Sequence, residues 1–272
     1  MNTTASHIRN AIRELGIQNQ PMIVHSSLRS FGWVDGGPTT VIDALLSEGC
    51  TVMVPSFDFE SFVAPPHGVS PQRNSISYDP YPAPQADISI PVYAPESNSI
   101  ARGLGAIPCA LIEYGDRIRG SHPLESFTAV GPLAHQLIDT QTPIEVFAPF
   151  DALADLGGWV VLMGVGLNRA TLIHHAEQKA GRHPFIRWAN GVDGKPFEAW
   201  LSGCSGGFDR LEAPLSHLKR EITVGESLWK VYPVKEMLEQ AAILIKNDPQ
   251  ITHCSNPDCL SCNDAIAGGP IV

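Results

Sequence analysis

The pattern with the clearest chemistry in this sequence is a histidine and a glutamate three residues apart, His174 and Glu177. On a helix this spacing places both side chains on one face. A histidine titrates near neutral pH and can take a proton from an attacking nucleophile, while a neighbouring carboxylate can orient the ring or bind a cationic substrate. The competing base, His175, points roughly 100° away around the helix.

His-x-x-Glu pairs are also common on ordinary helices, so the position of this pair decides its interpretation. Residues 159–165, WVVLMGV, predict a buried strand that ends just before the helix. In open α/β sheets, ligands bind outside the carboxyl ends of the strands, which is where the pair falls. The sequence therefore predicts a catalytic or binding site around His174 and Glu177.

Two further polar segments are expected near the same site. His25, Ser26 and Ser27 directly follow a predicted strand, where hydroxyls and free backbone N–H groups can bind a phosphate or a carbonyl. This segment lacks the lysine and spacing of a P-loop, and G-x-G-x-x-G is absent, so ordinary nucleotide binding is not indicated. His122 and Ser126 lie in a proline-marked loop, where on that context alone a structural role for His122 is the stronger interpretation.

An irregular segment at residues 61–100 carries eight prolines and few periodic apolar positions. It predicts either a flap that lines a pocket or a surface loop. Asp58, Glu60 and Asp79 flank or lie in this segment and could bind ammonium groups of a cationic substrate. For each of them taken alone, a solvated surface carboxylate is the stronger interpretation.

The Cys-rich tail, residues 250–272, contains Cys254, Cys259 and Cys262, and Cys204 is a distant fourth cysteine. Zinc prefers four tetrahedral thiolate or imidazole ligands, and His253 could replace Cys204 in such a set. A reducing compartment disfavours disulfides. We expect a structural zinc site, with unrelated thiols or a disulfide as the alternatives.

The elements that must position these residues indicate an α/β fold. A strand at 22–24, a helix at 38–46 and a strand at 51–54 make a βαβ unit, which favours a parallel or mixed sheet. Further helices are predicted near 8–17, with Ser6 as its cap, and over 106–114, 172–178 and 231–246. No internal repeat or linker interrupts the chain, which predicts a single domain over residues 1–272 with 61–100 as an inserted flap.

The composition excludes several classes of protein. The 272 residues are 43% hydrophobic and 17% charged, which excludes disordered, collagen and coiled-coil proteins. The net charge of −10 favours cationic partners over nucleic acid or anionic membranes. No window approaches the roughly 18 continuous apolar residues of a membrane span, and the N-terminal segment is polar, so we expect a cytoplasmic protein. A homodimer is compatible with the sequence.

Several uncommon motifs occur together in the order typical of one known family. The chain resembles the aminoglycoside 3-N-acetyltransferases, or antibiotic N-acetyltransferases, in HSSLRSFGWVDGGPTTVIDAL (25–45), VPSFDF (54–59), GLGAIPCAL (103–111), SHPLESFTAVGPLA (121–134), VVLMGVG (160–166) and TLIHHAE (171–177). The resemblance implies a three-layer α/β/α fold with a central mixed sheet. It also implies acetyl-coenzyme A as donor and an amine as acceptor.

The resemblance also implies roles for particular residues. The family's Thr-x-x-His-x-x-Glu pattern falls on Thr171, His174 and Glu177, and its coenzyme-binding motifs fall on His25, Ser26, Ser27, Leu28, His122, Pro123, Ser126 and Phe127. Two departures are Ala170, where the family often has Asn, and His175, where it has an apolar residue. Neither departure removes the proposed base, His174. Both concern residues that are expected to line the acceptor pocket, so they bear on the identity of the acceptor.

The chemistry expected from these residues is direct acetyl transfer to a 3-amino group. An aliphatic ammonium is not a nucleophile at pH 7, so His174 must remove its proton as it attacks the thioester. The Thr171 hydroxyl or nearby backbone N–H groups are candidate oxyanion donors, worth roughly 3 to 4 kcal/mol in comparable sites. The alternatives are an acetyltransferase for another amine and a non-enzymatic, zinc-stabilised binding protein.

Overall fold

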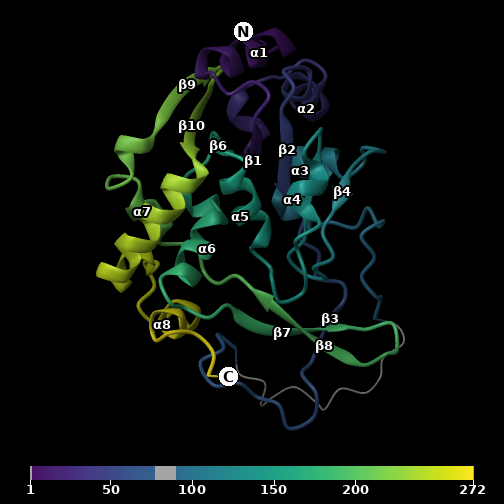
Figure 1. Ribbon diagram of the computed structural model, residues 1–272, viewed down its shortest axis with the longest axis vertical. Helices are drawn as coiled ribbons and strands as arrows, with labels where there is room; N and C mark the ends of the chain where they lie inside the picture. The colour runs from purple at the N-terminus through teal and green to yellow at the C-terminus, as the bar shows by residue number, and fades with distance from the viewer. Residues whose placement is uncertain (1, 77–89, 272) are drawn as a thin grey trace.

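The structure, a computed structural model, describes residues 2–76 and 90–271 (Figure 1). Its central layer is a seven-stranded mixed sheet in the order β4-β5-β2-β1-β6-β10-β9. The strands are β1 (Pro21–Ser26), β2 (Thr51–Pro55), β4 (Ile118–Arg119), β5 (Phe127–Val130), β6 (Trp159–Met163), β9 (Arg220–Val224) and β10 (Ser227–Pro233). A second, antiparallel sheet at the lower end of Figure 1 has the order β3-β7-β8 and consists of β3 (Phe62–Val63), β7 (Phe185–Asn190) and β8 (Pro196–Leu201).

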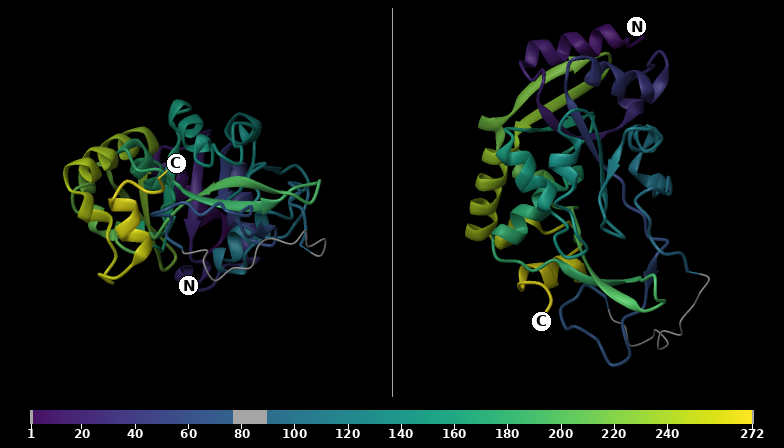
Figure 2. Two further views of the ribbon diagram at one scale, coloured as in Figure 1. Left: turned by 90° about the horizontal axis from the view of Figure 1, so that it is seen from below. Right: turned by 45° about the vertical axis from the view of Figure 1, so that its right-hand side comes forward.

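Helices cover both faces of the central sheet (Figures 1 and 2). One face packs against α4 (Ala134–Ile138), α5 (Ala148–Asp155), α6 (Leu172–Lys179) and α7 (Val234–Asn247). The other packs against α1 (Ala5–Leu15), α2 (Gly37–Ser47) and α3 (Ala106–Leu111), and α8 (Leu260–Ile266) lies near the start of β7. The predicted three-layer α/β/α fold is confirmed.

The strand sequences explain why both faces are covered. Successive side chains of a strand point to opposite faces, and here both sets are apolar. Ile23 belongs to the core under α4–α7, whereas its neighbours Met22 and Val24 belong to the core under α1–α3. A continuous apolar strand of this kind is stable only when helices pack on both sides.

The predicted βαβ unit forms the centre of the sheet. β1 pairs in parallel with β2 on one side and with β6 on the other. The carboxyl ends of these three strands therefore lie at one edge. Short 3-10 helices follow two of them, η1 (Leu28–Phe31) after β1 and η3 (Leu167–Arg169) after β6.

Several predicted element boundaries are wrong. The strand predicted at 159–165 ends at Met163. α1 is capped by Thr4, and Ser6 lies inside the helix, where its hydroxyl accepts a hydrogen bond from Arg9. The predicted 231–246 helix begins at Val234, because the preceding residues through Pro233 pair with β6. The predicted 106–114 helix ends at Leu111.

The 61–100 segment is largely irregular in the part that the structure describes, as the prolines predict. Residues 61–76 and 90–100 form no helix, and their regular structure is confined to the two-residue strand β3. None of the helices within residues 2–76 and 90–271 is both long and apolar enough to cross a membrane.

Candidate active site

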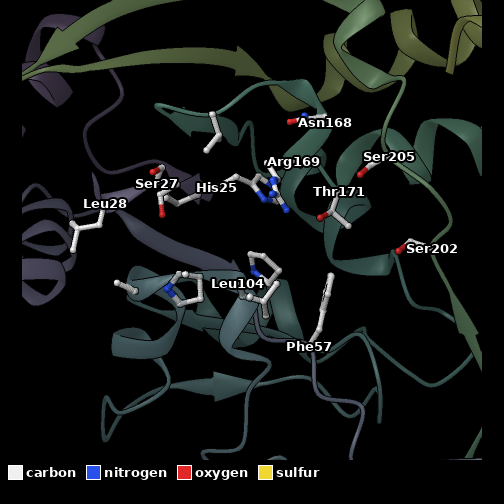
Figure 3. A pocket seen from close by; sticks show the side chains of 18 of the residues that line it. His25, Ser27, Leu28, Phe57, Leu104, Asn168, Arg169, Thr171, Ser202 and Ser205 are labelled. Atoms are coloured by element: carbon white, nitrogen blue, oxygen red, sulfur yellow. The ribbon is translucent and has the colours of Figure 1, made fainter. Parts of the chain in front are cut away.

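A cavity of about 560 Å³ opens where the carboxyl ends of β1, β2 and β6 meet (Figure 3). The ends of these strands and the segments that follow them supply one wall: His25, Ser26, Ser27, Leu28 and Arg29 at the end of β1, Pro55 and Phe57 at the end of β2, and Val165, Asn168, Arg169, Thr171 and His174 after β6. The remaining lining comes from residues 103–108 and from Ser202, Gly203 and Ser205. Figure 3 shows Phe57 and Leu104 across the cavity from His25 and Arg169.

A glycine lets two of these loops meet. Gly164 follows β6 directly and has a φ of +67°, a conformation that favours glycine. A Cβ atom at this position would lie 2.0 Å from Ser30 Oγ, so only glycine allows the loop after β6 to approach the loop after β1. The cavity is the space that these two loops then share with the 202–205 segment.

His174 and Glu177 lie on one face of α6, as their spacing predicts. His174 Nδ1 is 2.8 Å from Glu177 Oε2, and both residues are buried. Since an ionised carboxylate only accepts hydrogen bonds, Nδ1 carries the proton and Nε2 is left as the basic nitrogen. His174 lines the cavity, whereas Glu177 lies behind it.

His175 faces a different environment. Its ring stacks on Phe150 and its Nε2 lies 3.0 Å from Asp151 Oδ1. It does not line the cavity. The geometry therefore favours His174 as the base.

Glu177 has a second partner that the sequence analysis missed. The Arg182 guanidinium forms an ion pair with Glu177 Oε1, and also donates to Thr252 Oγ1 and to the Pro249 carbonyl, each at 2.7 Å. Arg182 lies beyond the end of α6, at a spacing from Glu177 that no helical periodicity would single out.

The predicted coenzyme segment lines the cavity along its whole length, from His25 to Leu28. The His25 ring is buried, and its Nε2 has no hydrogen-bond partner among the described residues. Burial, with a smaller effect from the positive charge of Arg169, lowers the pKa of His25 to about 3. His25 is therefore neutral at physiological pH, and Arg29 and Arg169 supply the positive charge of the lining.

The other predicted coenzyme residues, His122, Ser126 and Phe127, do not line the cavity. All three are fully buried. His122 Nδ1 accepts the Glu125 N–H at 2.8 Å, and its Nε2 donates to the Trp200 carbonyl at 2.8 Å. The geometry gives these three residues a structural role and provides no support for a coenzyme contact.

Of the carboxylates predicted to bind the acceptor, the two that the structure describes, Asp58 and Glu60, are absent from the described lining. Asp58 is buried and its Oδ1 accepts the Glu60 N–H at 3.0 Å, Glu60 is exposed, and Asp79 lies outside the described residues. A buried carboxylate that the sequence analysis missed, Glu125, contacts the lining residue Ser202. It accepts hydrogen bonds from the Ser202 N–H and hydroxyl, and burial raises its pKa against the opposing effect of these donors.

The four predicted zinc-binding cysteines are brought together. The Sγ atoms of Cys204, Cys254, Cys259 and Cys262 all lie within 4.8 Å of one another. His253, the alternative ligand, instead directs its ring nitrogens to the Cys254 carbonyl and the Asn263 side chain. All six cysteines carry free thiols, so the geometry does not support the disulfide alternative.

Comparison with known proteins agrees with this fold. The family model described as aminoglycoside 3-N-acetyltransferase matches residues 23–246. The chain belongs to this family. One relative, aminoglycoside N(3)-acetyltransferase VIII of Streptomyces fradiae, is 32% identical over 185 residues, which cover 65% of this chain and 61% of the relative. The chain thus spans about three fifths of that relative's length.

Solved structures in the aminoglycoside 3-N-acetyltransferase family have the same fold. The crystal structure of aminoglycoside acetyltransferase AAC(3)-IVa, as apoenzyme, has a TM-score of 0.77 at 22% identity and covers 98% of both chains. The complex of AAC-IIIb with CoASH has a TM-score of 0.72 at 19% identity and covers 91% of this chain and 97% of that one.

Histidine burial in this family member predicts that stability falls in mild acid. Burial lowers the pKa of His122 to about 4 and of His25 to about 3, whereas an unfolded histidine titrates near 6.5. The unfolded state therefore binds more protons, so this stability is complete above pH 6.5 and is lost as the pH falls toward 4. We expect the free energy of unfolding in urea to be about 2 kcal/mol lower at pH 5 than at pH 7 for each histidine.

The His122→Asn variant tests this assignment. Its unfolding free energy should change less between pH 7 and pH 5 than that of the wild type, by about one histidine's contribution. The exposed His135→Ala variant should keep the wild-type difference. Equal pH dependence in His122→Asn and wild type would show that His122 is not the group responsible.

Proposed function

We propose that the chain is an acetyl-coenzyme A-dependent N-acetyltransferase that acetylates the 3-amino group of aminoglycosides, with His174 as general base. The observation that carries this proposal is His174, which lines a cavity at the carboxyl ends of parallel strands and has its Nδ1 2.8 Å from Oε2 of Glu177 behind it. Membership in the aminoglycoside 3-N-acetyltransferase family supports the same reaction.

The geometry of His174 suits direct attack. With Nδ1–H donated to Glu177, Nε2 can take the proton of an amine as its nitrogen attacks the thioester carbonyl. The C–S bond of the resulting tetrahedral intermediate then breaks, and coenzyme A leaves as its thiol. No serine or cysteine hydrogen-bonds to His174 in the described part of the chain, so we propose transfer without an acyl-enzyme. The Thr171 hydroxyl, on the same lining, is the proposed oxyanion donor.

Acetyl-coenzyme A, the proposed acetyl donor, fits the charge of the cavity lining. Coenzyme A carries phosphates, and Arg29 and Arg169 are the charged side chains of the described lining outside histidine. The hydroxyls of Ser26 and Ser27, at the end of β1, offer further hydrogen bonds, whereas the Ser27 N–H already donates to the Met163 carbonyl. We therefore assign this lining to coenzyme A, and a cytoplasmic location, where acetyl-coenzyme A is made, is part of the proposal.

The acceptor is tested by following thiol release from acetyl-coenzyme A. Aminoglycosides that differ in their amino groups form one panel and simple polyamines form another. We expect release with aminoglycosides that carry a free 3-amino group and none with those that lack it. Release only with other amines would favour the alternative acetyltransferase, and absence of both coenzyme binding and release would favour the non-enzymatic binding protein.

We also propose that the thiolates of Cys204, Cys254, Cys259 and Cys262 hold a structural zinc ion. Zn–S bonds of about 2.3 Å place the sulfur atoms of a tetrahedral site about 3.8 Å apart, and the four Sγ atoms, within 4.8 Å of one another, need little movement to reach this. Burial raises the pKa of the Cys204 and Cys262 thiols, and the Gly206 N–H, 3.5 Å from Cys204 Sγ, and the Cys254 N–H, 3.4 Å from Cys262 Sγ, oppose this effect. Four protein ligands would leave no open position, so the zinc would not be catalytic.

Removal of this zinc should lower thermal stability. We expect one zinc per chain by elemental analysis of the purified protein, and a fall in Tm of at least about 5 °C after chelation, because metal binding contributes to folding free energy. Cys259→Ser should lose the zinc, whereas the matched variant Cys109→Ser, outside the cluster, should keep it. A metal-free native protein with an unchanged Tm would contradict the assignment.

A further inference from the structure

We propose that Arg182 is a positioning residue for the His174 and Glu177 pair and that it links this pair to the C-terminal segment. This inference rests on the proposed function of His174 as the base. It concerns a residue that lies outside the cavity lining and five positions beyond Glu177.

The geometry of Glu177 is the first support. Its two oxygens have different partners, since Oε2 accepts from His174 Nδ1 and Oε1 accepts from the Arg182 guanidinium. All three side chains are buried. With both oxygens engaged, the carboxylate cannot rotate without breaking a charge-assisted hydrogen bond, and the plane of the His174 ring is fixed in turn.

The second support is that Arg182 is itself held in place. Its Nη1 donates to Thr252 Oγ1 and its Nη2 donates to the Pro249 carbonyl, each at 2.7 Å. Its backbone N–H also donates to the Glu177 carbonyl at 3.1 Å, which closes the end of α6. A guanidinium with donors fixed on three sides is a rigid support, and a lysine could not reproduce this planar arrangement.

The C-terminal segment completes the connection. Pro249 and Thr252 belong to η6 (Pro249–Thr252), and Cys254 follows two residues later. The 204–207 loop packs closely against η6, since a Cβ atom on Gly207 would be 2.3 Å from the Thr252 carbonyl oxygen. The cysteine cluster joins the 204–207 loop to the C-terminal segment. It therefore holds in place Pro249 and Thr252, the two residues of η6 that accept hydrogen bonds from Arg182.

The main test compares Arg182→Met with the wild type. Methionine has a similar length but no donors, so we expect kcat to fall about tenfold with the KM for acetyl-coenzyme A unchanged within about twofold. The matched control is Arg13→Met, which removes a remote ion pair with Glu48 and should leave kcat unchanged. Equal kcat in Arg182→Met and the wild type would overturn the proposal.

A second pair of variants tests the link to the C-terminal segment. Thr252→Val removes the hydroxyl that accepts from Arg182, whereas Thr252→Ser keeps it. We expect Thr252→Val to lower kcat and Thr252→Ser to restore it, with no additional loss when Thr252→Val is combined with Arg182→Met. If the losses in kcat from Thr252→Val and Arg182→Met were independent and additive, Thr252 would not act through Arg182.

A measurement that does not depend on catalytic turnover tests the positioning role of Arg182 separately from the proposed acetyltransferase activity. The ¹⁵N shifts of His174 should show an Nδ1–H tautomer in the folded wild type and a mixture of tautomers in Arg182→Met. An inactive wild type that shows this difference would contradict the acetyltransferase proposal but keep the positioning role. Identical His174 shifts in both proteins would remove Arg182 from the site, whatever the activity.

Discussion

Replacing His174 with alanine is expected to lower kcat at least about a hundredfold while leaving folding and coenzyme binding nearly intact. The substitution removes the nitrogen that takes the proton of the attacking amine. Coenzyme binding should persist because the substitution leaves unchanged the charged and hydroxyl side chains that we assign to it, from Ser26 to Arg29 at the end of β1 and Arg169 after β6. The measurement is steady-state thiol release, combined with the Kd of acetyl-coenzyme A by calorimetry.

Two other histidines provide controls for this variant. His135→Ala removes an exposed histidine and should leave kcat unchanged. His175→Gln tests the competing base, and we expect a small change in kcat because His175 faces Phe150 and Asp151 instead of the cavity. A kcat near the wild-type value for His174→Ala, or a larger loss for His175→Gln, would remove His174 from the mechanism.

The sequence predicted the elements whose signal is local. The apolar runs of β1, β2 and β6 and the periodicity of α6 are visible within a few residues, and all four elements form as expected. The hairpin of β9 and β10 was not predicted, because Arg220, Glu221 and Lys230 make its pattern polar at an edge of the sheet. Strand β8 was missed for a related reason, since Ala199 and Leu201 are its only buried residues, and β7, although mostly buried, forms its sheet only with β8 and the two-residue strand β3.

The site was predictable in part for the same physical reason. His174 and Glu177 are neighbours on one helix, and Cys254, Cys259 and Cys262 are close in sequence, so spacing alone brings them together. Arg169, Glu125 and Arg182 depend on contacts between distant segments. The Arg182 contact with Thr252 joins residues 70 positions apart, and no local pattern encodes such a pairing.

Replacing Glu177 with glutamine is expected to lower kcat about a hundredfold or more with little change in the acceptor KM. The amide must place its NH2 group against either His174 or Arg182. Arg182 can only donate, so the amide oxygen faces Arg182 and the NH2 group faces His174 Nδ1. His174 then accepts at Nδ1 and carries its proton on Nε2, the tautomer that cannot act as the base.

The same geometry predicts an unusual kcat for the double variant of Glu177 and Arg182. When Arg182→Met is added to Glu177→Gln, nothing forces the amide oxygen toward position 182, and the oxygen can turn to accept from His174 Nδ1–H. The double variant should therefore have a higher kcat than Glu177→Gln alone, although Arg182→Met by itself lowers kcat. Steady-state kinetics on the four proteins measures this coupling.

The kinetic pattern also distinguishes the two roles open to Glu177. A carboxylate that bound the cationic acceptor would raise the acceptor KM when neutralised and leave kcat nearly unchanged. The structure favours the orienting role, because Glu177 lies behind His174 with both oxygens engaged. A raised KM with wild-type kcat would assign Glu177 to substrate binding, and a double variant no more active than Glu177→Gln would show that Arg182 does not select the tautomer of His174.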